Sequence, residues 1–296
     1  MQRDERPIVR VGPAGWSYED WKGIVYPAKM PPSVHALETI SQCFDTVEIN
    51  SSFYRPPNPK YCENWVKKVE SNPKFKFTAK LWQRFTHDRE DWPKEEETAL
   101  FVRGIEPLRE AGKLGAVLIQ FPWSFKRNDA NRRWLSNVIG TFQDYPLALE
   151  LRHASWDVAE VYEGLRERQV AFCNIDQPIF KNSIGPSDTV TAPLGYVRLH
   201  GRNHDDWFRE DAGRDDRYNY LYSPEELKPW IAKIETMREQ ATEIYAITNN
   251  HYRGQAVVNA FDLEEGLGKR DFTIPESLVD TYPQLKRLLH EQSAVE

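Results

Sequence analysis

Residues 195–200 read GYVRLH, a short β-rich stretch in which apolar and polar side chains alternate. Successive side chains of a strand point to opposite faces, so Val197 and Leu199 share one face while Arg198 and His200 share the other. In a parallel barrel, one face of each strand packs against the surrounding helices and the other faces the barrel interior. The stretch therefore indicates a barrel strand whose interior face carries ionisable groups.

Strand-like runs of the same kind recur along the chain, at residues 8–12, 46–50, 74–80, 115–121, 147–152, 170–176 and 243–250. Amphipathic segments predict helices between them, at residues 33–44, 59–71, 95–111, 129–142, 158–169 and 224–240. The last helix has a strong start signal, because Ser223, Pro224 and Glu226 match an N-cap, a first-turn proline and a capping-box glutamate. Residues 177–193 and 202–222 are expected to be long loops. The alternation predicts an α/β fold, a single (β/α)8 TIM-type barrel with parallel strands; a doubly wound sheet is the alternative.

The composition fits one domain spanning residues 1–296, with 40% hydrophobic and 28% charged residues and a net charge of −6. The chain has no apolar run long enough for a membrane span and no apolar signal region at its start, so we expect a cytoplasmic protein. Its three cysteines are too few and too scattered for a disulfide framework. The acidic balance argues against nonspecific nucleic-acid binding, although a local basic groove stays open. Nothing in the sequence fixes the oligomeric state.

The side chains of a strand form two alternating sets, each of which we call a parity. Polar residues gather on one parity of the predicted strands, near the carboxyl ends. We assign to the barrel interior an upper layer and a layer beneath it. The upper layer holds Asn50, Lys80, Arg152, Asp176, His200 and Asn250; the lower layer holds Glu48, Glu150 and Arg198. The same rule turns Cys173, Ile175, Tyr245 and Ile247 toward the helices. Since active sites of such barrels lie at the carboxyl ends of the strands, these polar residues are the predicted site.

Tryptophans are also concentrated there: seven of the ten follow a predicted strand, Trp16 and Trp207 among them. An aromatic rim can stack a sugar, a nucleobase or another flat ligand and exclude water. The alternative is that these rings only cap the barrel.

Several motifs resemble the YecE-like family, domain of unknown function 72. They are Gly15-Trp16-Ser17-Tyr18, the block from Thr46 to Tyr54, Phe77-Thr78-Ala79-Lys80, Gln120-Phe121-Pro122, Glu150-Leu151-Arg152-His153, the block from Tyr196 to Arg202, the block from Arg217 to Tyr222, and Asn249-Asn250-His251. They run in family order from about residue 11 to about residue 262. The resemblance implies a TIM-type barrel and brings no assigned reaction.

The residues themselves suggest acid–base chemistry on a small anionic, sugar- or nucleotide-like substrate. The candidate catalytic residues are Glu150, His200, Glu48 and Asp176, with Glu150 and His200 as the proton-transfer pair. Lys80, Arg152 and Arg198 would hold the anion. The full candidate binding set is Trp16, Asn50, Lys80, Gln120, Arg152, Arg198, Asn250 and Trp207. Hydrolysis, lysis and isomerisation all stay open.

Four other interpretations are compatible with the same residues. Glu150, Asp176 and His200 could ligate a metal in an isomerase- or endonuclease-like barrel, but Arg152 and Arg198 would repel it, so no metal or cofactor is predicted. A glycosidase pair of glutamates is a weaker possibility. A noncatalytic module could capture a ligand or a nucleic-acid end, and an ion-pair lattice could simply organise the barrel mouth.

Overall fold

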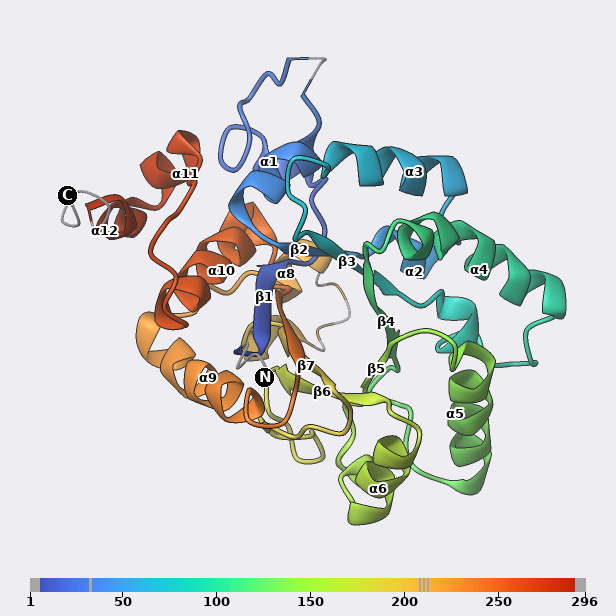
Figure 1. Cartoon of the computed structure of the whole chain (residues 1–296). Coiled ribbons are helices and arrows are strands. Elements are labelled where there is room, and N and C mark those ends of the chain that lie inside the picture. The colour runs from blue at the N-terminus through green and yellow to red at the C-terminus, as the bar shows by residue number, and fades with distance from the viewer. Residues whose placement is uncertain (1–5, 32–33, 208, 210, 212, 291–296) are drawn as a thin grey trace, which may run out of the picture.

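The computed structural model describes residues 6–31, 34–207, 209, 211 and 213–290. Its centre is an eight-stranded parallel sheet in the order β1-β8-β7-β6-β5-β4-β3-β2. The strands are β1 (Ile8–Pro13), β2 (Thr46–Ile49), β3 (Lys76–Lys80), β4 (Leu114–Gln120), β5 (Leu147–Glu150), β6 (Ala171–Asp176), β7 (Leu194–Leu199) and β8 (Glu243–Thr248). Helices surround the strands (Figure 1). The predicted (β/α)8 barrel is confirmed.

The barrel is nearly closed between β1 and β2. Ala14 and Glu48 form a parallel bridge, and the Gly15 amide donates a 2.8 Å hydrogen bond to the Glu48 carbonyl. The two strands approach so closely at Gly12 that a Cβ there would lie 2.0 Å from the Thr46 carbonyl oxygen. Only glycine fits at that point, so this position helps to bring the sheet edges together.

The outer helices agree with the six predicted ones: the helix at Asp129–Phe142 has the predicted bounds, and the other five are shorter at one or both ends. They are α1 (Ala36–Cys43), α3 (Pro59–Lys68), α4 (Glu95–Glu110), α5 (Asp129–Phe142), α6 (Ala159–Glu167) and α9 (Pro224–Met237), joined by α10 (Gln255–Gly266) after β8. Residues 177–193 are all described and contain no helix, as expected of the long loop. Shorter elements are α2 (Ser51–Tyr54), α7 (His204–Trp207), α8 (Arg214–Arg217), α11 (Glu276–Thr281) and α12 (Lys286–His290).

The predicted start of α9 is present in full. Ser223 Oγ accepts a hydrogen bond from the Glu226 amide, and the Glu226 carboxylate accepts one from the Ser223 amide. We expect Ser223→Ala to lower the free energy of unfolding by about 1 kcal/mol, because an amide of the first turn loses its acceptor. Urea denaturation measures the difference. Ser223→Asp restores an acceptor and should recover most of it; equal losses in both variants would contradict the capping argument.

Two apolar clusters fill the protein. The larger packs the outer faces of the strands against the helices, and the smaller lies on the inner faces. Val197 and Leu199 belong to the outer cluster, as the alternation in residues 195–200 predicts. Among the described residues, no helix is long and apolar enough to cross a bilayer.

The predicted facing is wrong for β6. Adjacent partners in a parallel sheet share a face, and the register pairs Ile175 with Arg198 and Asp176 with Leu199. Cys173 and Ile175 accordingly belong to the inner cluster. Asp176 faces the helices instead of the interior, and Arg202 and the Trp230 indole of α9 satisfy its charge there.

The same error affects β8. Tyr245 and Ile247 belong to the inner cluster, and Ile247 pairs with Arg198 across the sheet. Thr248 points outward, where its hydroxyl donates to the Ala256 carbonyl of α10 at 2.8 Å. Each parity of β8 holds two apolar residues and one polar residue, so its side-chain pattern alone does not identify the inner face.

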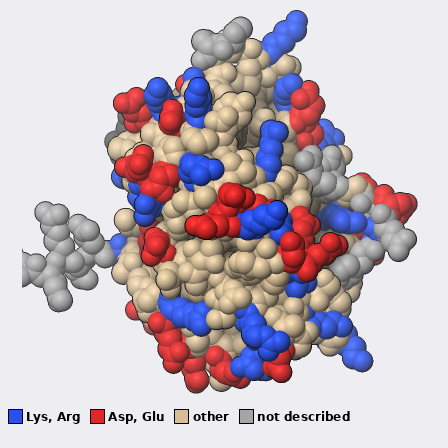
Figure 2. Space-filling view, turned by 90° about the vertical axis from the view of Figure 1, so that its right-hand side faces the viewer, with Lys and Arg blue, Asp and Glu red and all other residues tan. Residues whose placement is uncertain are grey.

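The surface carries charges of both signs. On the face shown in Figure 2, basic and acidic side chains are interspersed, and no single broad basic area is visible there. This pattern fits the acidic net charge of −6.

Candidate functional site

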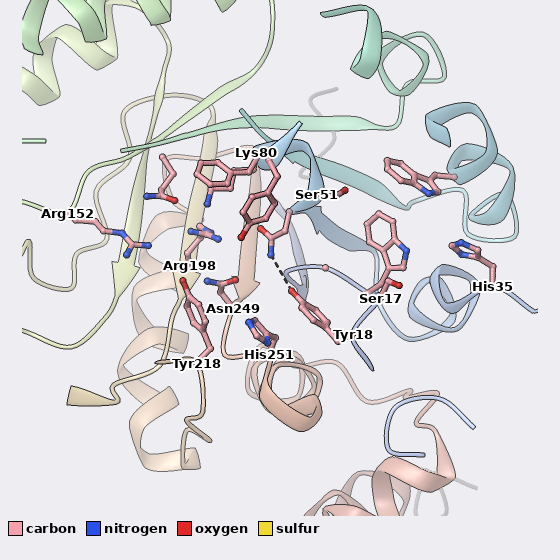
Figure 3. A pocket seen from close by; sticks show the side chains of 17 residues that line it. Ser17, Tyr18, His35, Ser51, Lys80, Arg152, Arg198, Tyr218, Asn249 and His251 are labelled. Atoms are coloured by element: carbon pink, nitrogen blue, oxygen red, sulfur yellow. Dashed lines mark hydrogen bonds between the residues drawn. The ribbon is translucent and has the colours of Figure 1, made fainter. Parts of the chain in front are cut away.

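A cavity of about 440 Å³ lies at the carboxyl ends of the strands. Its walls come from the loop after β1, from α2 and α3, and from the ends of β3, β4, β5, β7 and β8 (Figure 3). The lining residues are Gly15, Trp16, Ser17, Tyr18, His35, Asn50, Ser51, Phe53, Tyr54, Trp65, Lys80, Gln120, Arg152, Arg198, Tyr218, Asn249 and His251. The described lining residues include three basic side chains of lysine and arginine and no carboxylate.

A buried ion-pair lattice forms the floor. Arg198 is 1% exposed and donates through Nη2 to Glu48 Oε1 at 2.7 Å and through Nη1 to Glu150 Oε2 at 2.5 Å. The Tyr196 hydroxyl donates to the second oxygen of Glu48 at 2.9 Å. One arginine therefore links carboxylates from β2 and β5, which are separated in the sheet by β3 and β4, and both carboxylates are fully buried.

Glu150 also organises Arg152 and His200. Its Oε1 lies 2.8 Å from Arg152 Nε, 2.7 Å from Arg152 Nη2 and 3.3 Å from His200 Nε2. Burial alone would raise the pKa of Glu150, but the guanidinium groups of Arg198 and Arg152, together with His200, hold it well below the ordinary value. Glu150 is therefore an anion that fixes two arginines.

His200 is neutral in this setting. Burial, with Arg152 and Arg198 nearby, lowers the pKa of His200 to about 3, despite the opposing effect of Glu150. The Asn249 amide nitrogen lies 2.9 Å from His200 Nδ1, an arrangement in which Nδ1 accepts and the ring proton sits on Nε2, toward Glu150. His200 is completely buried and does not line the cavity.

Lys80 is the unusual cation of the site. It ends β3, lines the cavity, and its Nζ lies 3.9 Å from the centre of the Phe53 ring. In the described part of the chain, no carboxylate lies within 4.0 Å of this amine. Burial, followed by the charge of Arg198, lowers the pKa of Lys80 to about 7, although Glu150 and Glu48 act in the opposite direction. At neutral pH a large share of Lys80 is an uncharged amine.

Aromatic rings make up much of the rest of the wall. Trp16 meets Trp65 edge to face at 5.1 Å, and Tyr18 stacks on His251 at 4.5 Å. In Figure 3, Arg152 and Arg198 lie at one end of the cavity, His35 and Ser17 at the other, with Lys80 and Tyr18 between them. The cavity is therefore cationic at one end and largely aromatic at the other.

The structure brings most of the predicted site residues together. Six line the cavity, namely Trp16, Asn50, Lys80, Gln120, Arg152 and Arg198. Glu48, Glu150 and His200 lie buried beneath it. Trp207, in α7, lies beside it, with its ring 5.7 Å from the Arg152 guanidinium carbon and 6.2 Å from the His200 ring.

Two predicted residues lie elsewhere. Asp176 accepts hydrogen bonds from Arg202 at 2.8 and 2.6 Å and from the Trp230 indole of α9. Asn250 donates to the Tyr220 carbonyl at 2.7 Å and to the Asn259 side chain of α10 at 2.8 Å. Their placement in the interior layer is wrong, because both follow the outward parity of their strands.

Eleven of the seventeen lining residues were outside the predicted site set, and they include Tyr18, Tyr218, Asn249 and His251, which the sequence places only in family motifs. Asn249 and His251 continue the inward parity of Ile247, so the correct facing of β8 would have identified them. Tyr218 comes from the long loop after β7 and contacts the His251 ring at 5.1 Å. Its place depends on loop folding, which side-chain alternation does not predict.

The described residues contain no group of three His, Cys, Asp or Glu side chains arranged to hold a metal ion. Of the three ligands considered from the sequence, Asp176 faces α9, while Glu150 is engaged by two arginines. The residues present do not fit a divalent-metal centre at this mouth.

Fold and cavity together define a (β/α)8 barrel protein with a basic and aromatic cavity at the carboxyl ends of its strands. The chain belongs to the DUF72 family, described as "Protein of unknown function DUF72", whose model matches residues 10–282. This confirms the resemblance found in the motifs.

Known relatives match nearly the whole chain. The UPF0759 protein YunF of Bacillus subtilis (strain 168) is 32% identical over 274 residues, covering 87% of this chain and 94% of that protein. A DUF72 family crystal structure from Thermotoga maritima MSB8 has a TM-score of 0.78 and 36% identity, covering 88% of this chain and all of that one. A DUF72 family crystal structure from Enterococcus faecalis V583 has a TM-score of 0.79 and 26% identity, covering 90% of this chain and 98% of that one.

Proposed function

We propose that this protein is an enzyme that carries out acid–base chemistry on a small anionic substrate bound in the mouth of the barrel. The observation that carries the proposal is Lys80, an amine with a pKa of about 7 in a cavity wall without carboxylates. A catalytic base or acid works best when its pKa is close to the working pH. Burial and neighbouring cations are the usual means of tuning a lysine in this way.

Arg152 is the proposed anion-binding group. Its Nε and Nη2 are held by Glu150, which leaves Nη1 of the same guanidinium to meet a ligand in the cavity it lines. Arginine held in place by a buried carboxylate is preorganised for a carboxylate or phosphate. Arg198 already serves two carboxylates, so we assign it a supporting electrostatic role.

The sequence predicts Glu150 and His200 as the proton-transfer pair, and the geometry favours Lys80 for that step instead. Both are fully buried below the cavity lining. The pKa of Glu150 lies well below its ordinary value and that of His200 is about 3, so neither changes protonation near neutral pH. We assign them a positioning role, through Arg152 and Arg198.

Inorganic phosphate tests the anion site by thermal denaturation. We expect phosphate to raise Tm by a few degrees, since a ligand at 100 times its Kd stabilises a protein by about 2.7 kcal/mol. The shift given by sulfate, which stays doubly charged over this range, should be larger at pH 6 than at pH 8.5, because Lys80 loses its charge as the pH rises through its pKa of about 7. Arg152→Gln should remove most of the shift, while Arg109→Gln, on the exposed side of α4, should leave it unchanged. Equal shifts in both variants would refute the site.

A noncatalytic anion-binding module is the second candidate, favoured by the complete pairing of Glu48 and Glu150 within the floor. Lys80→Arg separates the two, because arginine keeps a cation but does not release its proton near neutral pH. An enzyme should lose product formation from a panel of phosphorylated sugars, nucleotides and carboxylates while still binding phosphate. A binding module would form no product before or after the change.

A further inference from the structure

We propose that Lys80 forms a covalent imine with the carbonyl carbon of a small oxo acid whose carboxylate binds Arg152. This inference rests on the proposed function, because it uses the same cavity and the same anion-binding arginine. It adds a substrate class, a carbonyl compound with a nearby acidic group, and a covalent role for the lysine.

The backbone of Lys80 is firmly held while its amine is not. The Ser52 hydroxyl of α2 donates to the Lys80 carbonyl at 2.7 Å, and the following residue, Leu81, donates its amide to Leu118 of β4 at 2.8 Å. The amine reaches the cavity beside the Phe53 ring, with no carboxylate of the described residues within 4.0 Å. A lysine whose backbone is held in place, and whose amine lies in the cavity with no carboxylate of the described residues beside it, is placed to act as a nucleophile.

The surroundings also favour the reactive, uncharged form. Desolvation is the main cause of the low pKa of Lys80, and the positive charges of Arg198 and Arg152 add to it. Desolvation or a neighbouring cationic group is a recognised way to activate lysine for addition to carbonyl groups. The carboxylates that could oppose this effect, Glu48 and Glu150, are engaged by Arg198 and Arg152.

The same charges select the substrate. Arg152 lies at the end of the cavity where Arg198 also approaches, and Lys80 is placed between that end and the aromatic end (Figure 3). An oxo acid can therefore place its carboxylate at Arg152 and its carbonyl carbon toward Lys80. The cavity of about 440 Å³ leaves room for a larger group against Trp16 and Trp65.

The step balances without an oxidant or a reductant. The uncharged nitrogen of Lys80 adds to the carbonyl carbon, the carbonyl oxygen gains a proton, and the resulting carbinolamine takes up a second proton as it loses water. The nitrogen loses one of its own protons on the way, so that one amine, one carbonyl group and one proton give one protonated imine and one water. The positive imine nitrogen then withdraws electrons from the neighbouring carbon, which eases proton removal or bond cleavage there.

Pyruvate with sodium borohydride tests the proposal, with acetone as the matched probe that lacks a carboxylate. Reduction of the imine would leave on Lys80 the mass of pyruvate less one oxygen atom, located by peptide mass spectrometry. We expect labelling of Lys80 to exceed that of other lysines at least about tenfold at pH 7, because few ordinary lysines are uncharged there. Lys80→Arg should abolish the label.

Two further variants make the test specific. Lys113, at the amino-terminal end of β4, also has a pKa lowered by burial, and Lys113→Met should leave labelling of Lys80 unchanged. Arg152→Gln should reduce labelling by pyruvate several-fold more than labelling by acetone, because acetone loses only the effect of the Arg152 charge on the Lys80 amine, whereas pyruvate also loses the partner of its carboxylate. Labelling spread evenly over the lysines would overturn the proposal.

The phosphate experiment separates this inference from the proposed function. If phosphate stabilises the wild-type protein through Arg152 but neither probe labels Lys80, the imine is refuted and the acid–base proposal stands. If phosphate has no effect and no label appears on Lys80, both the imine and the acid–base proposal are refuted.

Discussion

Replacing Arg198 by methionine is expected to lower the free energy of unfolding by about 3–5 kcal/mol, because it leaves buried carboxylates without their main partner. Among the described residues, the Glu48 carboxylate would keep only the Tyr196 hydroxyl as a hydrogen-bond partner, and Glu150 would keep Arg152 and His200. Methionine has a similar length, so the loss would come from charge rather than from a large cavity. Chemical denaturation at pH 7 measures it.

The pH dependence of this loss identifies its cause. Arg198 holds the pKa of Glu150 well below the ordinary value in the folded protein. Stabilisation of this kind is complete above the unfolded carboxyl pKa of about 4.3 and disappears as the pH falls toward the folded value. The difference between wild type and Arg198→Met should therefore be largest at neutral pH and shrink in acid.

A double variant provides the control. In Arg198→Met combined with Glu48→Gln, one unpaired charge is replaced by a neutral amide, and part of the lost stability should return. Should the double variant be as unstable as the sum of the two single changes, the two residues would act independently and the lattice would not be the source of the effect.

The barrel could be predicted from the sequence because each of its units carries a local signal. The strand containing Arg198 has one apolar and one polar parity, and so do the strands that carry Glu48, Lys80 and Glu150. In all four the polar parity faces inward, and Glu48, Glu150 and Arg198 satisfy one another's charges there. Pattern and energetics agree there, since buried charges are tolerated only when paired.

The misplaced residues show where local pattern is insufficient. Asn174 and Asp176 form a polar parity too, but their partners lie outside the barrel: the Thr189 carbonyl, the Ser187 hydroxyl and the Trp230 indole. Those partners come from the loop that follows the strand and from helix α9, more than 50 residues further along the chain, so the strand itself gives no sign of them. Register with β7 would have decided the facing, and register is a property of the assembled sheet.

The low pKa of Lys80 could not be predicted in the same way. A lysine at a strand end suggests an anion-binding cation, and only the three-dimensional arrangement reveals that its charge is desolvated and surrounded by arginines. Glu48 and Glu150 appear in the sequence as possible partners of Lys80. In the structure, however, Glu48 pairs with Arg198, and Glu150 pairs with Arg198 and Arg152. The distribution of partners changed the role of this residue from binding group to candidate reactive group.

Lys80→Met is expected to make the protein more stable at pH 6, by an amount on the order of a few kcal/mol. Below pH 7, Lys80 is protonated in both states, and the folded protein must hold a desolvated cation near Arg198. Between pH 7 and the ordinary lysine pKa of 10.5, the folded protein releases this proton while the unfolded chain keeps it. The free energy of unfolding of the wild type therefore rises with pH relative to the variant.

Urea denaturation of both proteins from pH 6 to pH 10 measures this trend, and the advantage of the variant should decline steadily above pH 7. Lys60→Met, on the exposed surface of α3, controls for loss of a surface charge and should run parallel to the wild type. Parallel curves for Lys80→Met as well would mean that the Lys80 amine keeps its ordinary pKa in the folded protein. In that case both its acid–base role near neutral pH and its reactivity toward carbonyl groups would lose their physical basis, because a fully protonated amine can neither accept a proton nor attack carbon.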